Sequence, residues 1–257
     1  MVASAPWQRW RPVAAPLVIP VLFVAVWSSG YLVGDLGTRA ASPLTLLFWR
    51  FAVATVVLVA VALATRAPWP RGLRIWVHLA VIGTLLRTIQ FAGVYLGLSM
   101  GVSAGLAALV VSASPLVIAV IAVPLFGERL SRRQGMGLAL GLTGVGLAVI
   151  AGLRGAQIAA LALTVAGLAG FVAGTLYQKH VGQAIDLRSG GSIQLIGATL
   201  TIAPLAALHG GLALPLTGAA LGSVAWLAVV NSIGGFTLNR PRFLAASFLA
   251  APGGALG

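Results

Sequence analysis

The chain has 257 residues, of which 60% are hydrophobic and only 7% are charged, and its mean hydropathy is +1.05. A water-soluble domain carries about a quarter of its residues as charged side chains, so this composition excludes a soluble globular protein. The net charge of +13 comes from arginines scattered between apolar blocks, which argues against a nucleic-acid partner and is typical of membrane proteins. Cysteine is absent and only three acids are present, so disulfides and thiolate chemistry are excluded and paired-carboxylate mechanisms are poorly supplied.

Eight apolar stretches are long enough to cross a bilayer, whose core of about 30 Å needs roughly 20 residues of α-helix. In chain order they cover Val13–Val33, Pro43–Thr65, Ile75–Ser99, Val102–Phe126, Gln134–Leu153, Gln157–Tyr177, Ser192–His209 and Leu221–Leu238. Arg9 and Arg11 precede the first stretch as they would in a signal peptide, but no small-residue cleavage site follows it. We therefore expect an all-α integral membrane protein with about eight transmembrane helices, the first of them uncleaved.

The basic residues predict the orientation of these helices. With a cytoplasmic N-terminus, twelve of the sixteen lysines and arginines lie in cytoplasmic segments, and only Arg39 and Arg154 lie outside. The remaining two, Arg50 and Arg87, fall within spans. Because cytoplasmic loops carry the excess of Lys and Arg, we expect both termini in the cytoplasm. All loops are short, so no soluble domain is expected.

Small residues recur at helical spacing in the third to fifth spans. The glycines concerned are Gly93, Gly97, Gly101, Gly105, Gly137 and Gly141. In lipid, small residues at this spacing let helix backbones approach closely. A dinucleotide-binding loop would need a preceding strand, which the sequence lacks, so we expect these glycines to serve helix packing.

Ser112, Ser114 and Pro115 lie in the middle of the fourth span. Proline removes one backbone donor and clashes with the preceding turn. In membranes this is tolerated where hydroxyl groups or a watery cavity satisfy the freed carbonyl. Two interpretations stay open: a simple kink, or a broken helix that lines a substrate cavity.

The segment 127–134 joins the fourth and fifth spans on the expected cytoplasmic side. Glu128 has three arginines within five residues, Arg129 being the first of them, and a charged turn that anchors the loop is the simplest interpretation. Ser131 and Gln134 have the spacing of a capping box, which predicts that the fifth helix begins here.

Arg87 is the most informative single residue because it falls near the centre of the third span. An ionised side chain at that depth is costly unless it faces protein or water, so it is by default a functional candidate. Gln90 and Tyr95 follow on the same helical face. The alternative is that the span boundary differs and Arg87 snorkels to an interface. Arg50 lies about two turns from the outer end of its span, where it can snorkel outward more easily than Arg87.

Aromatic residues end the first span on its expected outer side. Trp27 and Tyr31 are either interfacial anchors or part of a pore mouth. His78, His180 and His209 have no clustered partner in the sequence, so no metal site is indicated. No nucleotide-binding motif is present either, and we expect neither a cofactor nor, given the lack of a convergent acid, base and nucleophile, an enzyme.

Several of these motifs together resemble a known transporter family. The matching segments are Trp27–Gly30, Ser42–Leu44, Trp49–Phe51, Gly93–Tyr95, Gly101–Leu106, Ser114–Leu116, Leu125–Leu130 and Gly135–Val149. They resemble the first repeat of the EamA family, which belongs to the drug/metabolite transporter superfamily. Segments 174–179 and 230–234 resemble the ends of its sixth and eighth helices.

The resemblance implies ten helices in two inverted five-helix repeats, with a central cavity and export of small metabolites or drugs. The first repeat is then 13–153, a partial second repeat is 157–238, and 239–257 is an atypical short tail. The residues expected near the cavity are Trp27, Tyr31, Arg87, Gln90, Tyr95, Ser112, Ser114 and Pro115, with Arg87 and Gln90 placed there by depth and polarity. The expected partners are a small-molecule solute and the lipid bilayer of the cell's inner membrane.

The tail departs from the family pattern. After Leu238 comes a basic segment containing Pro241, and the apolar run 243–251 is about half the length needed to cross. We expect that this chain is an incomplete copy of a ten-helix transporter, most simply through a frameshift near Leu238. The leading hypothesis is thus a solute exporter, and the alternative is a truncated membrane protein that inserts but does not transport.

Overall fold

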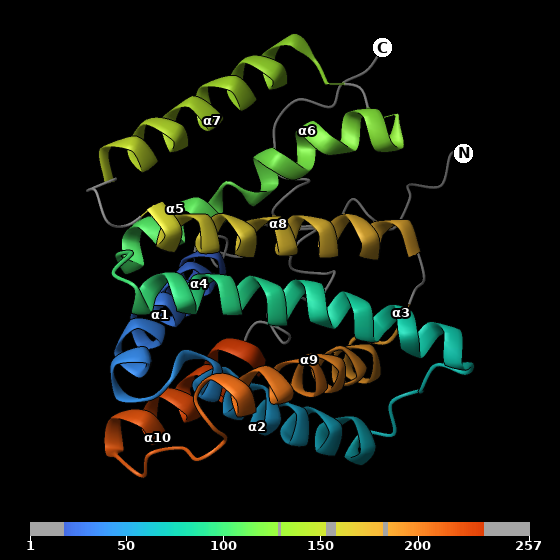
Figure 1. Cartoon of the computed structure of the whole chain (residues 1–257). Helices are drawn as coiled ribbons and strands as arrows, with labels where there is room; N and C mark the ends of the chain where they lie inside the picture. The colour runs from blue at the N-terminus through green and yellow to red at the C-terminus, as the bar shows by residue number, and fades with distance from the viewer. Residues whose placement is uncertain (1–17, 128–129, 153–157, 182–184, 234–257) are drawn as a thin grey trace, which may run out of the picture.

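The computed structural model describes residues 18–127, 130–152, 158–181 and 185–233, and its regular structure is entirely helical. In chain order the helices are α1 (Val18–Ala40), α2 (Pro43–Ala64), α3 (Leu73–Gly83), the π-helical segment η2 (Thr84–Ile89), α4 (Gln90–Ser99), α5 (Ala104–Ser112), α6 (Ser114–Phe126), α7 (Arg132–Gly152), α8 (Ile158–Val181), α9 (Leu187–His209), α10 (Gly218–Ala225) and the π-helical segment η4 (Trp226–Ile233). Figure 1 shows these elements in one view. The expected all-α class is confirmed.

The helices follow the predicted spans, except that α1 continues to Ala40 beyond the predicted end at Val33 and α9 begins at Leu187 before the predicted Ser192. The third span is the continuous rod α3–η2–α4, the fourth is α5–α6, and the eighth is α10–η4. Within the described residues, six helices are long and apolar enough to cross a membrane, and Gly218–Asn231 is a shorter apolar helix. The chain is therefore a multi-pass membrane protein. Glu128, Arg129 and the tail 239–257 lie outside the described residues.

Two antiparallel helix pairs form the centre of the molecule. The rod α3–η2–α4 runs beside α8, and α2 runs beside α9, as Figure 1 shows. The α1 helix crosses close to α4 and α10. By contrast, α6 and α7 stand apart at the top of Figure 1, and none of the described α7 side chains is buried. The core therefore lies between α1, α2, α4, α8 and α9.

Glycine packing occurs at the predicted α4 positions but not along most of α7. A Cβ on Gly93 would collide with the Leu163 carbonyl and with the Gly167 backbone of α8. Gly97 likewise faces Thr164 of α8. On α7, a Cβ on Gly137 would meet no atom within 4 Å among the described residues. Small residues thus bring the α4 and α8 backbones together, as expected in lipid.

The predicted start of α7 is confirmed. The backbone N–H of Gln134 donates to Ser131 Oγ over 3.3 Å, and the backbone N–H of Ser131 donates to Gln134 Oε1 over 2.9 Å. This reciprocal pair is a capping box. It satisfies two of the N–H groups that a helix start leaves without intrahelical partners.

The fourth span is interrupted at the predicted proline. Helix α5 ends at Ser112 and α6 begins at Ser114, with Pro115 in its first turn. The Ala113 N–H bonds the Val110 carbonyl, and the Ser112 hydroxyl donates to the Leu109 carbonyl over 2.7 Å. A serine hydroxyl therefore compensates for the shifted backbone bond, as the sequence suggested.

Candidate functional site

A buried arginine lies inside the helix core. Arg50 is on the second turn of α2, and only 1% of its surface is exposed. The expectation that Arg50 snorkels outward is therefore wrong. Its helix faces α4 and α9 rather than solvent, so its side chain extends into the protein. An arginine buried within a membrane span marks a functional candidate by default.

Two neutral side chains from distant helices accept hydrogen bonds from Arg50. Nη1 donates to the hydroxyl of Tyr95 on α4 over 2.8 Å. Nη2 donates to the amide oxygen of Asn231 on η4 over 2.7 Å. The guanidinium thus ties α2 to α4 and to η4, which are far apart in the sequence.

Helix α1 holds both partners of Arg50 in place. The Asn231 amide nitrogen donates to the Val26 carbonyl of α1 over 3.0 Å, which turns its oxygen toward Arg50. A Cβ on Gly30 would collide with the Asn231 amide. A Cβ on Gly34, one turn later, would lie 2.9 Å from Cζ of the Tyr95 ring. The two glycines give α1 a flat face against which these side chains pack.

Aromatic rings surround the guanidinium. Its Cζ lies 4.0 Å from the ring centroid of Phe91 and 5.9 Å from those of Phe51 and Tyr95. Phe91 meets Tyr95 edge to face at 6.0 Å. The negative face of an aromatic ring attracts a cation within about 6 Å of its centroid. The charge therefore sits in a buried, aromatic environment.

The free energy gained from these hydrogen bonds and cation–π contacts is about as large as the free-energy cost of burying the charge. Burying a guanidinium costs several kcal/mol. A hydrogen bond to a charged group returns about 1.5–3 kcal/mol, and a desolvated cation–π contact returns about 2 kcal/mol. Of the two acids in the described residues, Asp35 pairs with Arg39 and Asp186 with Arg188. Neutral dipoles rather than these carboxylates therefore stabilise Arg50.

Several residues that the sequence predicted near a cavity lie close to Arg50. Tyr95 bonds Arg50 directly, and the largely buried Tyr31 lies close enough to interact electrostatically with both. Trp27, one turn before Tyr31, packs against the same core. These residues form one group with Arg50, which we call the Arg50 site: Trp27, Tyr31, Arg50, Phe91, Tyr95 and Asn231.

Arg87 and Gln90 lie further along the same rod. Arg87 is in η2, where the helix widens, and its charge interacts with that of Arg50 across the core. Gln90 is 2% exposed, and its Nε2 has no hydrogen-bond acceptor among the described residues. The π-helical turn is held to α9 by Thr88, which bonds the Ala198 carbonyl and Thr201. Such turns occur frequently at functional sites.

The serines of the helix break do not join this group. Ser112 and Pro115 are exposed, which within a membrane span means that they face lipid or a neighbouring segment. Ser114 is buried, with 5% of its surface exposed. None of the three contributes a hydrogen bond to Arg50.

Sequence reasoning missed Arg50 and Asn231 as members of the site. Both are polar residues within predicted spans, and this is the sequence feature that could have identified them as site residues. Arg50 lies near a span end, where snorkelling is the simplest expectation. Only the packing of η4 against α2 brings its partner into reach.

Comparison with known proteins gives an independent line of evidence. The sequence profile described as the "EamA-like transporter family" matches residues 15–150. "Probable amino-acid metabolite efflux pump" proteins of Escherichia coli K12 and Salmonella typhimurium LT2 are each 30% identical, over 166 and 167 residues. These matches cover 64% of this chain and 53% and 54% of the relatives. The chain thus spans about half the length of these two relatives.

A third relative matches over a longer stretch. The "Uncharacterized inner membrane transporter YedA" of Escherichia coli K12 is 28% identical over 210 residues, covering 81% of this chain and 67% of the relative. No solved structure shows significant similarity to the chain.

Proposed function

The chain belongs to the EamA-like transporter family, and from that premise we propose that it exports small organic metabolites or drugs across the inner membrane. Two relatives are named as efflux pumps and a third as an inner membrane transporter, which supports transport rather than catalysis. The apolar helices supply the spans that such a protein needs.

The observation that carries the proposal is the buried Arg50, two of whose N–H groups donate to the neutral side chains Tyr95 and Asn231. Arg50 donates only to neutral oxygens in the two bonds that join it to Tyr95 and Asn231. A carboxylate or sulfonate accepts stronger hydrogen bonds from a guanidinium than a neutral oxygen does. The Arg50 site therefore favours solutes that carry an anionic group.

The aromatic rings around the Arg50 guanidinium suggest what the uncharged part of the solute is. Phe91 and Phe51 present aromatic surface around the guanidinium, and Trp27 and Tyr31 add more from α1. These rings favour an apolar or aromatic body beside the anion. We thus propose small aromatic or aliphatic anions and zwitterions as the solute class.

Arg87 and Gln90 extend this preference. Arg87 adds a second positive charge that interacts with Arg50, and Gln90 adds an amide N–H without an acceptor among the described residues. A surplus of hydrogen-bond donors is what an oxygen-rich anion satisfies. In this proposal Arg87 attracts the anion and Arg50 binds it.

Solute binding would also loosen the helix contacts that Arg50 makes. An anion at the guanidinium takes the place of the Tyr95 hydroxyl and the Asn231 amide oxygen. Helices α4 and η4 then lose their direct tie to α2. A carrier needs such an exchange, because its ligand must favour one arrangement of the helices over another.

Orientation and repeat structure complete the proposal. We place the N-terminus in the cytoplasm because twelve of the sixteen basic residues then lie inside. We retain 13–153 as a first repeat and 157–238 as a partial second repeat. The Arg50 site would then join the two, because Asn231 comes from the second and the other members from the first.

The test uses the purified full chain in liposomes and three probes that share one phenyl body. L-Phenylalanine is a zwitterion, 2-phenylethanesulfonate is a permanent anion, and 2-phenylethylamine is a cation. We expect saturable transport of the first two, and binding of 2-phenylethylamine that is weaker by about tenfold or more. Arg50→Gln should slow 2-phenylethanesulfonate transport about tenfold or more, whereas Arg71→Gln, in an exposed loop, should not.

Two results would overturn the proposal. Transport no faster than through protein-free liposomes, with folded protein, would favour the alternative of a membrane protein that does not transport. Equal rates for Arg50→Gln and the unchanged chain would show that Arg50 only supports the fold.

A further inference from the structure

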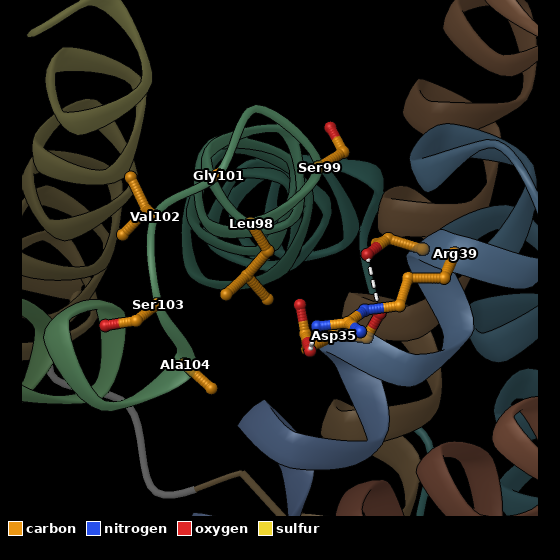
Figure 2. A pocket seen from close by; sticks show the side chains of 9 residues that line it. Asp35, Arg39, Leu98, Ser99, Gly101, Val102, Ser103 and Ala104 are labelled. Carbon is orange, nitrogen blue, oxygen red and sulfur yellow. Dashed lines mark hydrogen bonds and ion pairs between the residues drawn. The ribbon is translucent and has the colours of Figure 1, made fainter. Parts of the chain in front are cut away.

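A cavity of about 580 Å³ opens at the end of the bundle where α1 ends. It lies between the last turns of α1 and the turn that joins α4 to α5. Asp35 and Arg39 come from α1, Leu98 and Ser99 from α4, and Ala104 from the start of α5 (Figure 2). The volume is within the range of about 300–1,000 Å³ that small-molecule sites occupy. We call this space the end cavity.

The end cavity presents two opposite charges side by side. Arg39 Nη2 lies 2.7 Å from Asp35 Oδ2, and the two residues are one helical turn apart. The Arg39 side chain is 73% exposed and that of Asp35 is 23% exposed. An ion pair so open to solvent contributes little to stability. A ligand that offers each partner a new counter-charge can therefore replace the pair at small cost.

Apolar surface lies next to these charges. The Leu98 side chain points toward the Asp35–Arg39 pair, and Ala104 closes the cavity from the other helix, as Figure 2 shows. Leu98 is 4% exposed and belongs to the main core, so it is a fixed wall. A cavity with paired charges and one apolar wall matches a ligand with the same arrangement.

We propose that the end cavity binds zwitterions with an apolar side chain, which is the chemistry of an α-amino acid. The ligand's ammonium group pairs with Asp35, its carboxylate pairs with Arg39, and its side chain packs on Leu98. A zwitterion replaces both sides of the pair whereas a ligand with one charge replaces only one side, so we expect zwitterions to bind more tightly than singly charged ligands.

The end cavity is adjacent to the Arg50 site but distinct from it. Tyr31 lies one turn before Asp35 on α1, and Gly34 contacts the Tyr95 ring that bonds Arg50. Tyr31 of the Arg50 site and Asp35 of the end cavity are thus about one helical turn, or 5.4 Å, apart along α1. The role of the cavity as a step in export rests on the proposed function, whereas binding to it does not.

The experiment is isothermal titration calorimetry on the full chain in nanodiscs. Saturating 2-phenylethanesulfonate is present throughout, so that the Arg50 site is occupied if it binds anions. L-Phenylalanine is then titrated against the unchanged chain, Asp35→Asn, Arg39→Gln and the control Asp186→Asn. The control makes the same chemical change at an ion pair outside the cavity. Circular dichroism and size-exclusion chromatography verify that each variant is folded.

We expect L-phenylalanine to bind the unchanged chain and the control equally. Asp35→Asn and Arg39→Gln should each weaken binding about tenfold or more, and 2-phenylethylamine should bind about tenfold more weakly than L-phenylalanine. Absence of L-phenylalanine binding, or equal binding by folded Asp35→Asn, would overturn the inference. Equal binding of 2-phenylethylamine would overturn it as well, since the cavity would then be a simple cation site.

Failure of this inference is separable from failure of the proposed function. Binding of 2-phenylethanesulfonate alone reports on the Arg50 site, and binding of L-phenylalanine in its presence reports on the end cavity. Either can be found without the other.

Discussion

Arg50 and Asn231 are separated by 181 positions in the sequence, yet Arg50 Nη2 lies 2.7 Å from the Asn231 amide oxygen. The bond joins α2 to η4 inside the bundle, where burying a charge without hydrogen-bond partners is costly. Because Asn231 is neutral, this bond solvates the positive charge of Arg50 without adding a counter-charge. That difference underlies the proposed selectivity for anions.

The close approach of α1 to Tyr95 predicts an unusual effect of alanine. In a helix interior, Gly→Ala normally stabilises by roughly 0.5–1 kcal/mol. Gly34→Ala should instead destabilise by about 1–3 kcal/mol, because its methyl group would lie 2.9 Å from Cζ of Tyr95. Gly135→Ala on α7 is the matched control, since its Cβ would meet no described atom within 4 Å. Denaturation in detergent measures both, and a stabilised Gly34→Ala variant would contradict this packing.

The start of α9 predicts a pH dependence. The Arg188 guanidinium donates to the Asp186 carboxylate and holds the pKa of that carboxyl below its usual value. A carboxyl whose pKa is lowered by folding stabilises the protein above its unfolded pKa of about 3.9 and loses this contribution as pH falls. Asp186→Asn should therefore lower the unfolding temperature more at pH 6.5 than at pH 3. An equal loss at both values would show that the carboxylate charge is not involved.

The arrangement of helices accords well with what the sequence predicts, for a simple physical reason. In a membrane protein each span must be apolar over about 20 residues, so hydropathy alone locates the helices. The capping box at Ser131 and the break before Pro115 were also predictable, because their causes lie within a few residues. Such local causes can be recognised without knowing the tertiary structure.

The candidate site could be predicted only in part. Tyr31 and Tyr95 were expected near a cavity, and both lie at the Arg50 site. Arg50 itself was expected at an interface, because its depth in α2 allows snorkelling. The contacts of α2 with η4 bury Arg50 instead, and no local sequence pattern encodes contacts between segments so far apart. The end cavity depends in the same way on how α1 meets the α4–α5 turn.

The charge pattern predicts the orientation in the membrane. Reporter fusions at Arg71, Arg133 and Arg188 should all report a cytoplasmic location, because the basic residues gather in these loops. Fusions at Gly101 and Gly211, in turns at the other helix ends, should report the opposite side. A periplasmic signal at any of the three arginines would contradict the proposed topology.

The most direct test of the anion site is to give Arg50 a permanent counter-charge. Asn231→Asp places a carboxylate where Arg50 now finds a neutral oxygen, and Asn231→Ala removes that oxygen without adding charge. We expect Asn231→Asp, which also loses the amide N–H that donates to the Val26 carbonyl, to remain folded by size-exclusion chromatography yet to transport 2-phenylethanesulfonate about tenfold more slowly or worse. Asn231→Ala should keep transport within a few-fold of the original rate. Transport by Asn231→Asp at the rate of the unchanged chain would contradict the account, because a cancelled charge at Arg50 would then make no difference.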